Sequence, residues 1–81
     1  MIDEKEIGRR IKKALRISGK TEYELAKILG YSESTIHGYI LGKHMPNIFT
    51  LMNIAEVLKT TPDYILGFSN SVRRKGGKSD E

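Results

Sequence analysis

Apolar positions recur at helical spacing along most of the chain. After Asp3, the residues Ile7, Ile11, Ala14 and Leu15 follow the spacing i, i+4, i+7, i+8, which places them on one face of an α-helix. The alternation of apolar and polar residues that marks a half-buried strand does not occur in the sequence. The pattern therefore predicts an all-α fold.

Five helical segments follow from this periodicity and from the residues that bound it. Ser, Thr, Asp and Asn favour helix starts, and glycine in the left-handed conformation ends helices. Thr21 and Glu24 have the Thr-x-x-Glu spacing of a capping box, and Pro62 suits the first position of a helix. The expected segments, with their bounding residues, are 3–19, 21–30, 32–42, 47–58 and 61–67.

The composition changes after residue 68. Residues 69–81 are mostly Asn, Ser, Arg, Lys and Gly, with almost nothing apolar, and such a segment cannot bury a core. We therefore expect one folded domain in residues 1–68 and a basic, disordered tail in residues 69–81.

The segment from Thr21 to Leu41 has the pattern of a helix-turn-helix. A glycine, Gly30, ends one short helix, and the next cap, Ser32, follows two residues later, so the chain must turn sharply. Ala26 has a small side chain where the two helices would cross. The side chains expected to converge inward from both helices are Leu25, Leu29, Tyr31, Ile36 and Tyr39. In this motif the second helix can enter the major groove of DNA.

The composition of the chain excludes several classes of chemistry and of cellular location. The net charge of +4 is uneven, since residues 1–20 carry seven basic and three acidic side chains, and it favours nucleic-acid binding only weakly. The absence of cysteine excludes disulfides and thiol chemistry, and the two histidines lack metal-site spacing. No apolar run reaches the length of a membrane span, and the first residues do not form a signal peptide. We expect a cytoplasmic protein without metal, cofactor, membrane contact or evident small-molecule ligand.

Several motifs together resemble the Cro/repressor-type helix-turn-helix family, the group of phage repressors and xenobiotic-response-element proteins. The resemblance covers residues 7–67 and implies a five-helix, lambda-repressor-like domain that binds double-stranded DNA. It is carried by Ile7-Gly8-x-x-Ile11, Thr21-x-x-x-Leu25-Ala26-x-x-x-Gly30, Ser34-Thr35-Ile36, Gly42-Lys43-x-x-Pro46, Leu51-x-x-Ile54-Ala55-x-x-Leu58 and Asp63-Tyr64-Ile65-Leu66-Gly67.

The chain departs from the family pattern at three positions. Glu22 replaces the usual glutamine, and its carboxylate cannot donate a hydrogen bond to phosphate. Leu15 and Ile40 replace a buried Arg–Glu pair. Replacing both partners leaves no unpaired buried charge, so we interpret this double change as a repacked core.

Carried over position by position, the resemblance implies a DNA-contacting surface. Within this surface, Glu33 would accept a hydrogen bond from a cytosine amino group, and His37 would donate one to guanine N7 or O6. The alternative for His37 is an ordinary exposed helix residue without a base contact. The residues expected to read bases are Ser32, Glu33, Ser34, His37 and Gly38. Those expected to contact the DNA backbone are Thr21 and Glu22, through their amides, and Leu41, Lys43 and His44. Basic residues of the first helix, Arg9, Arg10, Lys12, Lys13 and Arg16, would add long-range attraction or form an ordinary solvated face.

The resulting hypothesis is a sequence-specific transcriptional regulator, a repressor of phage or mobile-element type that binds a palindromic operator as a homodimer. A protein-interaction module of the same fold, antitoxin-like or anti-repressor, is the alternative, since Glu22 and Glu33 are acidic. No nucleophile–base pair or carboxylate dyad indicates an enzyme.

A dimer interface is expected at the last helix. Tyr64, Ile65 and Leu66 are consecutive, and residues about 100° apart around a helix cannot all face one core. Phe68 and Val72 add apolar area just beyond. Pairing with a second copy would cover this surface; the alternative is that Phe68 folds back onto the monomer core.

Overall fold

Polar caps and left-handed residues bound the five helices of the chain. The computed structural model describes residues 2–73, in which all regular secondary structure is helical. The helices are α1 (Glu4–Ser18), α2 (Glu22–Leu29), α3 (Glu33–Leu41), α4 (Ile48–Leu58) and α5 (Pro62–Leu66). This confirms the expected all-α, five-helix, lambda-repressor-like fold.

Helix ends form where the sequence predicts them. Thr21 accepts a hydrogen bond from the Glu24 amide while the Glu24 side chain accepts from the Thr21 amide, so the capping box is complete. Four helices end at a glycine with positive φ, but α4 ends at Lys59, whose φ is 58°. A lysine in this left-handed region is strained, and the sequence contained no signal for it.

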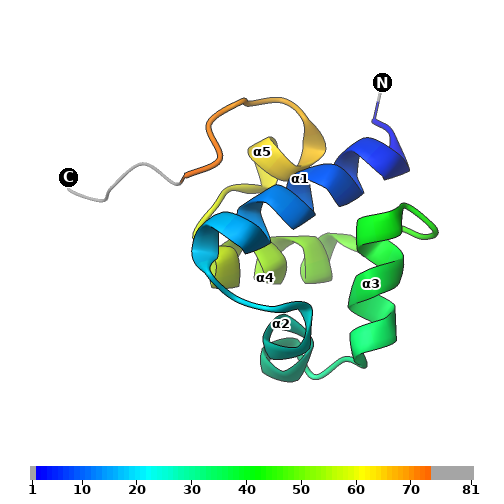
Figure 1. The fold of residues 1–81 in the computed structure, drawn as a ribbon. Coiled ribbons are helices and arrows are strands. Elements are labelled where there is room, and N and C mark those ends of the chain that lie inside the picture. Colours follow the sequence, from blue (N-terminus) through cyan, green and yellow to red (C-terminus); the bar gives the residue numbers. More distant parts are fainter. Residues whose placement is uncertain (1, 74–81) are drawn as a thin grey trace.

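The helices bury one core. In Figure 1, α4 lies between α2 on one side and α1 and α5 on the other, and α3 runs across the end of α1. Leu15 and Ile40 are both buried, as the repacked-core interpretation requires. The buried apolar side chains are Ile7, Ile11, Ala14, Leu15, Leu25, Ala26, Ile36, Tyr39, Ile40, Leu51, Ile54, Ala55, Leu58, Tyr64 and Ile65.

A glycine allows α1 to approach α3 closely. A Cβ atom at Gly8 would lie 2.3 Å from the Ile40 carbonyl oxygen and 2.6 Å from that of Tyr39. Both clashing atoms belong to the backbone of α3. The backbones of the two helices are therefore in contact, and the C-terminal half of α3 is held against α1.

The packing of helix α5 changes the dimer interface expected at the last helix. This helix packs against both α1 and α4, so two of its faces are covered. Tyr64 and Ile65 are only 4% and 0% exposed, and the expectation that they are surplus to the monomer core is wrong. Leu66 is half-buried, whereas Phe68 is 70% exposed, which also rules out the alternative that Phe68 completes the core.

Arg10 joins α1 to the chain that follows α5. Its guanidinium donates to the backbone oxygens of Tyr64 and Ser69, at 2.9 and 2.7 Å, and to Asn70 Oδ1. The same group lies 4.8 Å from the Tyr64 ring centroid, and Glu6 Oε2 accepts from Arg10 Nε at 2.8 Å. Arg10 is thus a structural residue, which corrects the alternative that it belongs to an ordinary solvated face.

Contacts of the domain continue past the expected boundary at residue 68. Besides the bonds of Ser69 and Asn70 to Arg10, Val72 is half-buried against the core. The rest of the expected tail, residues 74–81 with Arg74, Lys75 and Lys78, lies outside the described residues. Within residues 2–73, no helix combines the length and hydropathy needed to cross a membrane.

Candidate nucleic-acid interface

The connection between α2 and α3 is a tight turn. Gly30 has a φ of 79°, a conformation that glycine adopts without strain. The Tyr31 amide then donates to the Ala26 carbonyl at 2.9 Å, which closes the end of α2. Ala26 is buried, and Leu25 and Ile36 join the core from the two helices. The geometry is that of a helix-turn-helix.

Tyr31 fixes this turn to α4. Its hydroxyl lies 2.6 Å from the Thr50 hydroxyl, and Thr50 is buried. Tyr31 as a whole is 40% exposed, so the expectation that its side chain converges inward holds only in part. The bond ties the turn to the neighbouring helix and limits movement of α3 relative to the core.

One face of α3 is open to solvent. Glu33, Ser34 and His37, all expected to read bases, are exposed there, and Leu41 continues the same face. Glu33, Ser34 and His37 also line an open hollow together with Glu22 of α2. Ser32 lies at the start of α3, where its hydroxyl caps the helix by accepting from the Thr35 amide.

Glu22 and His37 form a contact that the sequence did not predict. The distance from Glu22 Oε1 to His37 Nδ1 is 3.0 Å. The two residues were assigned separate roles, at the DNA backbone and at a base. Their pairing depends on the angle between α2 and α3, for which spacing along the sequence holds no signal.

Gly38 does not lie on the open face of α3. It is buried, and a Cβ atom there would lie 2.4 Å from the His44 ring. That ring also meets Tyr39 edge to face, with centroids 5.0 Å apart. Burial raises the pKa of the Tyr39 hydroxyl, with a further contribution from Tyr31. The base-reading role expected for Gly38 is therefore wrong; the glycine makes room for His44 after α3.

Among the residues expected to contact the DNA backbone, some backbone amides already donate hydrogen bonds within the protein. The Thr21 amide donates to Glu24 Oε1 at 2.9 Å, so in this structure the capping box occupies the donor expected to contact a phosphate. The Lys43 amide likewise donates to the Gly38 carbonyl, which leaves the exposed Lys43 side chain for an anion. Leu41 is exposed beside it.

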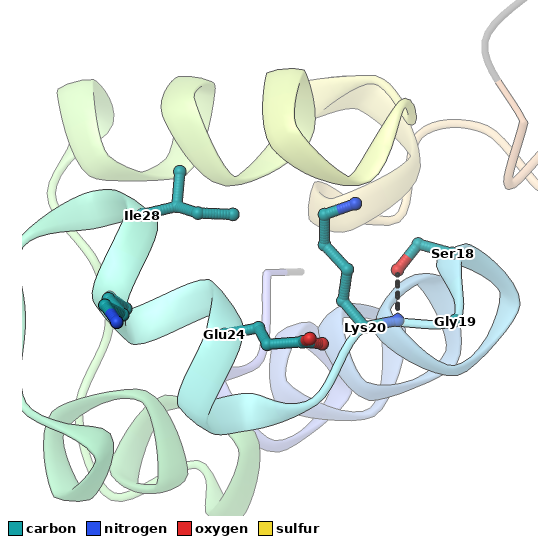
Figure 2. A pocket seen from close by; sticks show the side chains of 6 residues that line it. Ser18, Gly19, Lys20, Glu24 and Ile28 are labelled. Carbon is teal, nitrogen blue, oxygen red and sulfur yellow. Dashed lines mark hydrogen bonds between the residues drawn. The ribbon is translucent and has the colours of Figure 1, made fainter.

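A second hollow lies between the end of α1 and α2 (Figure 2). Polar groups in this hollow form hydrogen bonds at the helix ends. Ser18 Oγ donates to the Leu15 carbonyl and accepts from the Lys20 amide at the end of α1. Glu24 belongs to the capping box at the start of α2. The lining residues are Ser18, Gly19, Lys20, Glu24, Lys27 and Ile28. Within residues 2–73, no cluster of His, Cys, Asp or Glu suits a metal ion.

Comparison with protein families agrees with this geometry. The family model described as Helix-turn-helix matches residues 11–65, more than half of the chain. The chain belongs to the Cro/repressor-type helix-turn-helix family. This is a family of DNA-binding transcription regulators, typically without enzymatic activity. No curated protein and no solved structure matches the chain.

Proposed function

We propose that the chain is a sequence-specific transcriptional repressor of phage or mobile-element type, acting in the cytoplasm on a palindromic operator. The observation that carries the proposal is the open face of α3, which the core holds in place on three sides. Gly8 brings α1 against α3, α2 packs against α3, and the Tyr31–Thr50 bond fixes the turn. A helix exposed and fixed in this way is suited to a major groove.

Base reading falls to the exposed residues of this face. Glu33, Ser34 and His37 would meet base edges, with Ser32 at the entry to the groove. Lys43 would contact a phosphate with its side chain. Such phosphate contacts orient the protein on the duplex, and the base contacts supply the discrimination.

We propose a homodimer in which Phe68 is the central contact. The support is its 70% exposure beside half-buried Leu66 and Val72. A two-fold interface covers such a patch with one surface, and a palindromic site requires two α3 helices about 34 Å apart, one turn of DNA. Phe68→Ser should leave the domain folded and change the complex on an inverted repeat from 2:1 to 1:1 in sedimentation. A wild-type complex of 1:1 stoichiometry at saturating protein would exclude the dimer.

A protein-binding module is the second candidate function. An apolar surface on α4 favours it: Ile48, Phe49 and Met52 are all exposed, Phe49 by 75%. Exposed apolar patches on small domains often mark protein contacts. The acidic side chains of Glu22, the first residue of α2, and Glu33, the first residue of α3, also suit a basic protein partner.

Titration of bulk duplex DNA at several salt concentrations tests the proposed function. A DNA-binding domain loses affinity as salt rises, with a slope that reports the number of phosphates contacted. We expect a slope of several units, and Lys43→Ala should reduce it by about one. Absence of binding at low salt would overturn the DNA-binding proposal in favour of the protein-binding module.

A further inference from the structure

The Glu22–His37 contact places a carboxylate against the residue best placed to read a base. Glu22 lies in the first turn of α2 and His37 in the middle of α3, and their atoms Oε1 and Nδ1 are 3.0 Å apart. The His37 side chain remains 54% exposed. Glu22 thus contacts the ring at Nδ1, while more than half of the side chain stays exposed.

This contact determines which nitrogen of His37 carries the proton. An ionised carboxylate only accepts hydrogen bonds, so His37 Nδ1 must be the donor. In a neutral imidazole one nitrogen donates and the other accepts. In the neutral ring Nε2, on the far edge from Glu22, is therefore an acceptor.

We propose that Glu22 is a positioning residue that makes His37 read an amino group in the major groove. Adenine and cytosine present amino donors there, whereas guanine presents the acceptors N7 and O6. An acceptor at Nε2 matches the first two bases and opposes guanine. This reverses the donor role toward guanine expected from the sequence, and it rests on the proposed function.

The neighbouring side chain supports the same selectivity. Glu33 lines the hollow that contains His37 and Glu22, and its carboxylate also only accepts hydrogen bonds. The open face of α3 thus presents acceptors at two positions. Ser34, between them, can donate or accept and does not alter this preference.

The proton position is measured directly by ¹⁵N NMR of the imidazole nitrogens in the free protein. At about pH 8, above the range in which histidine ordinarily titrates, we expect the His37 proton on Nδ1. Glu22→Gln places an amide there that can donate to Nδ1, so the form protonated on Nε2 should become populated. A wild-type proton on Nε2, or an identical spectrum for Glu22→Gln, would overturn the proposal without reference to DNA.

The base preference is measured with duplexes that the wild-type protein selects from a random pool. At the position contacted by His37, adenine or cytosine should be favoured over guanine by roughly tenfold. Glu22→Gln should reduce this preference severalfold. The matched control is Glu24→Gln, which removes a charge from the same turn of α2 and keeps the capping box.

The outcomes separate this inference from the function on which it rests. If the wild-type protein selects no duplex and binds none at low salt, both the proposed function and the inference fail. If it selects a duplex but Glu22→Gln keeps the preference, or Glu24→Gln weakens it equally, only the role of Glu22 is overturned.

Discussion

Replacing Gly8 with alanine should force α1 and α3 apart. The added Cβ would lie 2.3 Å from the Ile40 carbonyl oxygen, whereas ordinary contact begins at 3.4 Å, so the helices must separate by about 1 Å in a close-packed interior. Overpacking costs about 1–3 kcal/mol, and a clash between backbones belongs at the upper end. Alanine offsets about 1 kcal/mol through its helix propensity. The expected net loss is about 2 kcal/mol.

Thermal and denaturant unfolding of Gly8→Ala measure this loss, which corresponds to a fall in Tm of roughly 10 °C for a domain of this size. The matched control is Gly38→Ala, also within a helix, where the clashing atom belongs to the His44 ring. That ring can swing into solvent, so the propensity gain and the lost ring contact should cancel to within about 1 kcal/mol. Equal effects of the two changes, or a stabilised Gly8→Ala protein, would refute the reasoning.

Three further changes test other features of the fold by unfolding measurements. Lys59→Gly should stabilise the domain by about 0.5–1 kcal/mol, because it removes a lysine from φ 58°; no gain would contradict this. The Thr60 hydroxyl is buried without a hydrogen-bond partner among the described residues, so Thr60→Val should stabilise by about 1 kcal/mol, and a loss would show that the hydroxyl is satisfied. Hydrogen bonds from Arg10, and to a smaller extent from Arg9, lower the pKa of Glu6 below 4.5. The ionised Glu6 therefore stabilises the folded protein above about pH 4.5, and this stabilisation is lost as the pH falls through the lowered pKa of the folded state. Glu6→Gln should remove that part of the acid dependence, and an unchanged pH profile would contradict the pairing.

The helices were predictable from the sequence because their signals are local. A cap such as Thr21, an apolar stripe such as Ile7 to Leu15, and a terminating glycine such as Gly30 each act within a few residues. The same holds for the exposed face of α3, since Glu33 and His37 fall off the stripe that contains Ile36.

Contacts between distant segments were not predictable in this way. Arg10 looked like one more basic residue of a solvated face, but it bonds to residues 54 and 59 positions away. Tyr64 and Ile65 looked surplus because one core face was assumed for α5, whereas α1 and α4 cover two of its faces. Periodicity describes the faces of one helix and holds no information about how many neighbours that helix has.

The central claim, that the open face of α3 discriminates between sequences, is tested by the ratio of affinities for a selected duplex and a scrambled one. We expect His37→Ala to lower that ratio, because it weakens the selected complex by about 1–3 kcal/mol while leaving the scrambled complex nearly unchanged. Lys43→Ala should weaken both complexes alike and preserve the ratio. Equal losses on both duplexes for His37→Ala, or a random pool from which no sequence is enriched, would contradict the account.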